Sequence, residues 1–232
     1  MAEFADENSG VEVSGMQHHQ VKKRGLANGW SGALLLLLLA LFTASAHSAS
    51  KTVLVLGDSL SAEYGLARAS GWVTLLERRL KAENVNANVV NASISGETTS
   101  GGRTRLPALL AQHHPQIVLI ELGANDALRG LALDATETNL RALITMVQKA
   151  GARTLLLGMQ IPPNYGRDYA GRFAALYPRL ARETRSALVP FFLQGVADQP
   201  ALFQADRLHP TAQAQSALLE NVWPHLKPLV LK

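Results

Sequence analysis

The sequence contains no cysteine in its 232 residues. This absence excludes disulfides, thiolate metal sites and a cysteine nucleophile, although it leaves the cellular compartment open because exported proteins need not carry disulfides. A phosphate-binding glycine loop, a dinucleotide fingerprint and a long internal repeat are also lacking, and no histidine pairs with carboxylates at metal-ligand spacing. We therefore expect neither a metal nor another cofactor.

A strong charge bias is lacking as well. Charged residues make up 17% of the chain, hydrophobic residues 47%, and the net charge is +4, which is typical of a globular protein. Several arginines gather on one predicted helical stretch, but a glutamate interrupts them and no aromatic residues alternate with them: Arg167, Arg172, Arg179, Arg182 and Arg185. This pattern favours a solvated helix face, with anionic lipid or cell-surface polymer as the alternative partner, and gives no sign of nucleic-acid recognition.

No hydrophobic run is long enough to span a bilayer comfortably, which takes ~20 residues. The apolar run 33–42 follows the basic cluster at 22–24 and precedes small residues at 44–50, an order typical of a secretory signal. We predict a signal peptide over 16–49, preceded at 1–15 by a leader or an artificially added segment. The protein would then be exported, periplasmic or secreted, with no stable membrane anchor after cleavage; an uncleaved anchor is the alternative.

The remaining residues, 50–232, are long enough for one α/β domain with a core of its own. Five short apolar runs favour buried strands, at 52–56, 88–91, 117–122, 154–158 and 188–192. Stretches with helical apolar spacing separate them, and a last helix is expected from near Pro210 to about Trp223, where Pro224 would end it. This alternation predicts a single three-layer α/β/α sandwich around a five-stranded parallel sheet. In such sheets the working site lies outside the carboxyl ends of the strands.

Residues suited to acyl chemistry follow three of these strands. Ser59 comes directly after the first strand, where Gly57 permits a sharp turn and the N–H of Ser59 can face a forming anion. Gly96 follows the second strand and offers another N–H, and Asn125 follows the third with an uncharged side-chain donor. We expect Ser59, Gly96 and Asn125 to form an oxyanion hole.

A carboxylate and an imidazole stand close together near the C-terminus. The spacing in Asp206-Arg207-Leu208-His209 lets Asp206 reach one nitrogen of His209 and leaves the other nitrogen for Ser59. A serine hydroxyl needs such a base, which histidine can supply near neutral pH. Each motif alone could be a turn or a helix cap, but their joint placement at strand ends and helix starts favours a catalytic triad of Ser59, Asp206 and His209.

These blocks resemble the GDSL hydrolases, which are also called SGNH hydrolases. The four letters S, G, N and H are matched in order by Ser59, Gly96, Asn125 and His209. The resemblance covers essentially 51–232 and is closest to the bacterial periplasmic thioesterase I/lysophospholipase and arylesterase branch. The segments of this narrower likeness are 90–96, 123–130, 162–166 and 188–192. It implies a flavodoxin-like sheet, the same triad and oxyanion hole, broad substrate tolerance and a 125–130 loop that shifts when an acyl chain binds.

The sequence departs from that branch at two positions, since Ala124 and Ala127 stand where glycines are common. Alanine narrows backbone freedom, so we expect a stiffer loop and an altered chain-length preference. An apolar acyl groove is expected from Leu128, Met159, Ile161, Pro162 and Tyr165, for which ordinary packing is the alternative.

The leading hypothesis is a broad esterase, thioesterase, lysophospholipase and arylesterase that acts as a monomer on small-molecule acyl esters, thioesters or lysophospholipids. Two alternatives remain: a polysaccharide deacetylase or acyltransferase that uses the same serine, and a non-catalytic exported binding domain.

Overall fold

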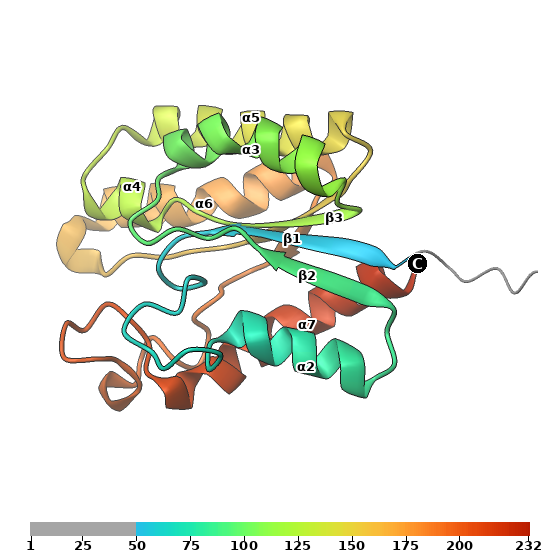
Figure 1. Ribbon diagram of the computed structural model, residues 1–232. Coiled ribbons are helices and arrows are strands. Elements are labelled where there is room, and N and C mark those ends of the chain that lie inside the picture. Colours follow the sequence, from blue (N-terminus) through green and yellow to red (C-terminus); the bar gives the residue numbers. More distant parts are fainter. Residues whose placement is uncertain (1–49) are drawn as a thin grey trace, which may run out of the picture. The chain divides into compact units, whose positions relative to one another are not determined.

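Five parallel strands form one sheet in the order β2-β1-β3-β4-β5 (Figure 1). Their bounds are β1 Lys51–Gly57, β2 Ala87–Asn91, β3 Ile117–Glu121, β4 Arg153–Leu157 and β5 Ala187–Val189. The structure, a computed structural model, describes residues 50–232. All residues of β3 are buried, as the apolar run predicts for a central strand covered on both faces.

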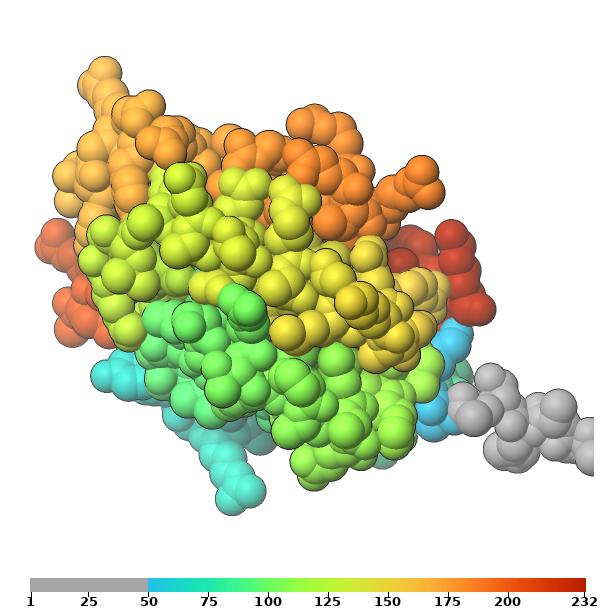
Figure 2. Space-filling model, turned by 90° about the horizontal axis from the view of Figure 1, so that it is seen from above, coloured from blue at the N-terminus to red at the C-terminus, as the bar shows by residue number. Residues whose placement is uncertain are grey.

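Helices cover both faces of this sheet. On one face lie α2 (Trp72–Ala82) and α7 (Gln215–Leu231); on the other lie α3 (Thr99–His113), α5 (Leu133–Lys149) and α6 (Arg167–Thr184), with the short α4 (Ala124–Leu128) after β3 (Figure 1). Figure 2 shows α3 in green, α5 in yellow and α6 in orange, side by side. The predicted three-layer α/β/α sandwich with a flavodoxin-like strand order is confirmed.

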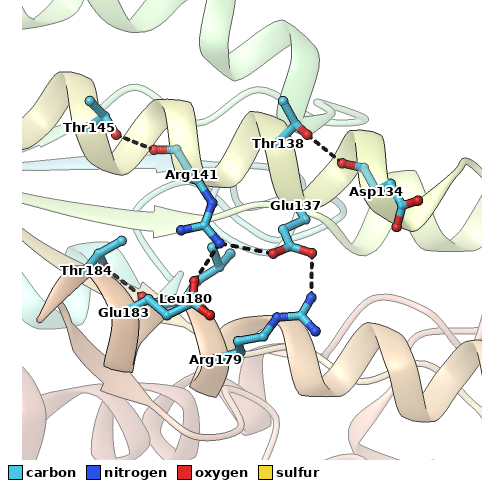
Figure 3. Close-up of polar contacts among 9 residues, drawn as sticks. All are labelled: Asp134, Glu137, Thr138, Arg141, Thr145, Arg179, Leu180, Glu183 and Thr184. Atoms are coloured by element: carbon cyan, nitrogen blue, oxygen red, sulfur yellow. Dashed lines mark hydrogen bonds and ion pairs between the residues drawn. The ribbon is translucent and has the colours of Figure 1, made fainter.

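The helix faces explain this packing. The residues that give α5 its helical apolar spacing, Leu140, Leu143, Ile144 and Val147, are fully buried. Its polar side contacts α6 through charges: the guanidinium of Arg141 donates to Glu137 at 3.1 Å and to Glu183 at 2.6 Å, and Arg179 also pairs with Glu137 (Figure 3). The arginines of α6 thus face solvent and neighbouring carboxylates.

Three predicted boundaries are wrong, at both ends of the last helix and at the end of the fifth strand. The last helix begins only at Gln215 and continues through Pro224 and Pro228 to Leu231. Pro224 is exposed, while side chains on the opposite side, among them Trp223 and Leu226, are buried. Burial of this apolar face outweighs the backbone hydrogen bonds that the prolines remove.

Strand β5 is shorter than predicted, because here a proline does end the element. It ends at Val189 rather than at 192, because Pro190 has no N–H to donate to the ladder. The chain nevertheless stays beside β4, since the N–H of Phe192 donates to the carbonyl of Gly158 at 2.8 Å.

The expected leader at 1–15 and signal peptide at 16–49 lie outside the described residues. Within residues 50–232, no helix combines the length and the apolar character needed to cross a membrane.

Candidate active site

Ser59 lies on a tight turn between β1 and α2, and its neighbours fix that turn. The carboxylate of Asp58 accepts from the N–H of Leu60 at 3.0 Å, and the carbonyl of Asp58 accepts from the N–H of Ala62 at 3.0 Å. The N–H of Asp58 itself donates to Glu121 at 3.2 Å. The turn therefore presents Ser59 at the carboxyl edge of the sheet, partly buried.

Ser59, His209 and Asp206 form one chain of hydrogen bonds. His209 Nε2 lies 2.9 Å from Ser59 Oγ, and His209 Nδ1 lies 2.7 Å from Asp206 Oδ2. Because an ionised carboxylate can only accept, Nδ1 carries the imidazole proton and Nε2 is free to accept from the serine hydroxyl. The structure thus brings together the three residues that the sequence selects as a triad.

The Asp206 carboxylate is held in place by its own turn. Its Oδ1 accepts from the N–H groups of Leu208 at 2.9 Å and His209 at 3.1 Å. Together with the His209 side chain, these bonds lower the pKa of Asp206 to about 2, with the Leu208 N–H contributing most. Arg207 adopts the left-handed region, with φ of 56°, which folds the turn back on itself. Asp206 therefore stays ionised throughout the neutral range.

Two residues that the sequence analysis did not select tie the histidine loop to the serine loop. The Tyr64 ring lies 4.3 Å from the His209 ring, centre to centre. The Gln204 side chain donates to the carbonyls of Tyr64 at 2.9 Å and Pro210 at 3.2 Å, and its backbone N–H donates to the carbonyl of His209 at 2.8 Å. A contact between positions 140 residues apart leaves no periodic signal in the sequence.

Asn125 sits at the start of α4, beside the Ser59 turn. Its Nδ2 donates one hydrogen to Asp58 Oδ2 at 2.9 Å, which leaves the second amide hydrogen for a ligand. Burial raises the pKa of Asp58 to about 6. The hydrogen bonds that its carboxylate accepts lower the pKa and offset part of this rise, and the bond from the Leu60 N–H has the largest such effect. Asp58 thus orients the amide of Asn125.

Gly96 occupies the loop after β2 with φ of 79°, a conformation that glycine adopts readily. The Arg129 guanidinium donates to its carbonyl at 2.9 Å, which fixes the peptide beside the end of α4. Within residues 50–232, no backbone acceptor engages the backbone N–H of Ser59 or Gly96. Gly96 does not line the pocket, so its part in an oxyanion hole stays a prediction.

Asp126, next to Asn125, is buried and has a structural part. Its carboxylate accepts from the N–H of Thr99 at 2.9 Å and from the hydroxyl of the same residue at 2.5 Å. It thereby joins the start of α4 to the start of α3 and does not face the reacting groups.

A pocket of about 520 Å³ opens at Ser59, His209 and Asn125. Four of the five predicted groove residues line it, namely Leu128, Met159, Ile161 and Pro162, whereas Tyr165 does not and is 42% exposed. A further wall, which was not predicted from the sequence, comes from the connection between β5 and α7, with Phe191, Leu193, Ala197, Pro200 and Phe203. The signal for this wall is the apolar run that begins after Pro190.

Among the described residues, no cluster of three or more histidine, aspartate or glutamate side chains is arranged to hold a metal ion.

Comparison with known proteins shows which family the chain resembles. Residues 55–217 match the GDSL-like lipase/acylhydrolase family. The chain is 50% identical to esterase TesA of Pseudomonas aeruginosa, over 86% of this chain and 97% of the relative, and 43% identical to thioesterase 1/protease 1/lysophospholipase L1 of Escherichia coli K12, over 87% and 94%. A crystal structure of TesA superposes with a TM-score of 0.76 at 52% identity, covering 77% of this chain and 99% of that one. The resemblance seen in the sequence motifs is confirmed, and the chain belongs to the GDSL-like lipase/acylhydrolase family.

Proposed function

We propose that this protein is a serine hydrolase that cleaves carboxylic ester and acyl thioester bonds through an acyl-enzyme on Ser59. The observation that carries this proposal is the hydrogen-bonded chain from Asp206 through His209 to Ser59, which ends at the mouth of an apolar pocket. A nucleophile, a base and an orienting carboxylate in this geometry are the parts that acyl transfer requires.

In the first half-reaction, Ser59 Oγ attacks the carbonyl carbon while its proton moves to His209 Nε2. Asp206 stabilises the imidazolium that forms, and the low pKa of Asp206 keeps it charged for this purpose. The tetrahedral oxyanion is held by the free amide hydrogen of Asn125 and by the backbone N–H groups of Ser59 and Gly96. Each such donor is worth about 3 kcal/mol of barrier height.

The intermediate collapses when the bond to the leaving alcohol or thiol breaks and His209 returns its proton to that group. Water then takes the place of the leaving group: His209 accepts a proton from it, the water oxygen attacks the ester carbonyl of acyl-Ser59, and Ser59 leaves with the proton. The cycle consumes one water and releases one carboxylic acid.

The character of the pocket points to the acyl group as the part of the substrate that is recognised. Its walls are mostly aliphatic and aromatic side chains, with Gln160 and Arg207 among the polar ones, and it opens directly at Ser59. Esters, acyl thioesters and lysophospholipids share this acyl chain and the same tetrahedral intermediate, and relatives bear the names esterase, thioesterase and lysophospholipase. We propose this broad range for the present chain.

A panel of substrates tests the proposal. p-Nitrophenyl esters of increasing chain length, acyl-CoA thioesters and lysophospholipids are assayed with wild type and Ser59→Ala. We expect hydrolysis by wild type and loss of at least about 10³-fold in kcat for Ser59→Ala. Activity that survives in Ser59→Ala would overturn the proposed nucleophile. A competing alcohol in the same assay detects acyl transfer, which would favour the acyltransferase alternative.

We further propose that residues 16–49 export a domain that begins at 50 and acts as a monomer. The sequence order of basic, apolar and small residues supports export. Expression of the full chain in a bacterium, followed by fractionation and N-terminal sequencing, tests it. A mature N-terminus near residue 47 or 50 in the exported fraction is the expected result, and size-exclusion chromatography checks the monomer.

A further inference from the structure

Glu121 is a fully buried carboxyl group directly beneath the turn that carries Ser59, and the mechanism above does not use it. It is the last residue of β3 and pairs in register with Gly57, the last residue of β1. A carboxyl group at 0% exposure is costly to bury, so its contacts need an explanation.

One oxygen of Glu121 holds the serine turn on both sides of the nucleophile. Glu121 Oε2 accepts from the N–H of Asp58 at 3.2 Å and from the hydroxyl of Ser61 at 2.8 Å. The indole Nε1–H of Trp72 donates to Ser61 Oγ at 3.2 Å, which directs the serine hydroxyl hydrogen toward Glu121. These contacts restrain the residue immediately before Ser59 and the residue two positions after it.

Gly57 has no side chain because Glu121 occupies the space. A Cβ at position 57 would lie 2.7 Å from Glu121 Oε2 and 2.8 Å from Ser61 Oγ, closer than non-bonded atoms approach. The glycine at the end of β1 thus makes room for the carboxyl group, whereas its φ lies outside the left-handed region, so the turn does not depend on the conformational freedom of glycine at this position.

The surroundings of Glu121 favour its uncharged form. Its other oxygen, Oε1, is buried and has no hydrogen-bond partner in the described part of the chain, and no lysine or arginine within residues 50–232 forms an ion pair with Glu121. Burial first, and the nearby Asp58 carboxylate second, raise the pKa of Glu121 well above its ordinary range. The Tyr177 phenol on α6, whose own pKa burial raises, stays neutral.

We propose that Glu121 is a positioning residue, a neutral carboxylic acid that fixes the Ser59 turn from inside the sheet through Asp58 and Ser61. It acts on catalysis through the placement of Ser59 and touches no substrate. This inference rests on the proposed function of Ser59, and it names a residue on which the turn depends.

Three variants separate positioning from simple packing. Glu121→Gln keeps a neutral acceptor oxygen in the same place, so kcat should stay within about threefold of wild type and the pH profile of kcat should not change. Glu121→Leu removes the acceptor, so kcat should fall about tenfold or more while KM changes little, because a small displacement of the nucleophile affects the transition state most. Leu119→Ala, a truncation in the same strand away from the turn, is the control: it lowers thermal stability but leaves kcat of the folded protein unchanged.

A double-mutant cycle covers the case in which Glu121→Leu fails to fold. Ser61→Ala removes the hydrogen bond between Ser61 and Glu121 by deleting its donor. Because Glu121→Gln keeps the acceptor oxygen, Ser61→Ala should lower kcat by about the same factor in the wild-type and in the Glu121→Gln background. If Ser61→Ala leaves kcat unchanged in both backgrounds, or if Glu121→Gln lowers kcat about tenfold, the positioning proposal is overturned.

Infrared spectroscopy tests the charge state without relying on activity. At pH 8, wild type should show the C=O stretch of a protonated carboxyl group, and Glu121→Gln should lack it. Absence of this band in wild type overturns the neutral state. Failure of wild type to hydrolyse any ester or thioester would instead overturn the proposed function, and the infrared result would still decide the charge of Glu121.

Discussion

Asn125 and Asp58 lie 67 residues apart in the sequence and are joined by a 2.9 Å hydrogen bond from amide Nδ2 to carboxylate Oδ2. This contact links the predicted oxyanion donor to the residue that precedes the nucleophile. The aspartate of the Gly57-Asp58-Ser59-Leu60 motif thus has a definite part in the site: it turns the amide of Asn125 so that one hydrogen is used and the other is left for a ligand.

The raised pKa of Asp58 predicts a dependence of stability on pH. The pKa is about 6 in the folded chain against 3.8 normally, so between these values the folded chain keeps a proton that the unfolded chain has released. Asp58 should therefore lower the free energy of unfolding by at most about 3 kcal/mol as the pH rises from about 4 to about 6, in addition to the decrease that the raised pKa of Glu121 contributes in the same direction. Urea unfolding of wild type and Asp58→Asn across this range measures it.

In Asp58→Asn this part of the slope should vanish. Asp168→Asn, which removes an exposed carboxylate on α6, is the matched control and should keep the wild-type slope. Equal slopes for wild type and Asp58→Asn would contradict the assignment. Asp206 does not disturb the measurement, because its lowered pKa makes it lose its stabilising contribution only as the pH falls from 3.8 toward about 2.

Asp206→Asn should lower kcat by about 10²–10⁴-fold with little change in KM. An amide at this position can donate to His209 Nδ1 and so favour the tautomer that cannot accept from Ser59. Steady-state kinetics on a p-nitrophenyl ester check this, with Asp198→Asn as an exposed control of the same charge change. A kcat within about threefold of wild type would show that His209 is oriented by something other than Asp206.

The contact between the Tyr64 and His209 rings, whose planes are tilted by 38°, predicts different effects of two variants at Tyr64. An aromatic face near the imidazolium stabilises its positive charge by about 1 kcal/mol, so Tyr64→Ala should lower kcat about fivefold. Tyr64→Phe keeps the ring and should behave as wild type. If both variants lose activity equally, the hydroxyl rather than the ring matters, and the proposed role of the ring contact is wrong.

Ala127 lies in α4 and is fully buried, between Asn125 and the pocket residue Leu128. Glycine at this position costs about 1 kcal/mol of helix stability and loosens the segment. Ala127→Gly should therefore change the acyl-chain profile, measured as kcat/KM across p-nitrophenyl esters of increasing length. Identical profiles for the two proteins would refute the idea that a stiffer segment sets chain-length preference.

The sequence is informative wherever a pattern is local. The apolar runs predict all five strands, and the rule that sites lie at the carboxyl ends of strands is enough to select Ser59 and Asn125. Asp206 and His209 are three residues apart, so their contact follows from a single turn. Local spacing therefore carries both the sheet and the proposed triad.

Features that depend on distant contacts could not be predicted in this way. The hydrogen bond from the Gln204 side chain to the Tyr64 carbonyl joins two separate loops. The pocket wall that the connection from β5 to α7 supplies likewise depends on packing between distant segments. In the sequence, Pro224 predicts the end of the last helix. In the structure α7 continues past Pro224, because burial of the helix's apolar face stabilises it. Glu121 ends an otherwise apolar strand. A glutamate in such a run is the sequence signal that indicates a buried carboxyl group.

Intact-protein mass spectrometry after reaction with an alkyl p-nitrophenyl phosphonate tests the central claim most directly. The account predicts one phosphonyl adduct per chain, located on Ser59 by peptide mapping, formed in step with the loss of esterase activity and absent from Ser59→Ala. An adduct on another residue with the same loss of activity, or full activity after Ser59 is modified, would contradict it.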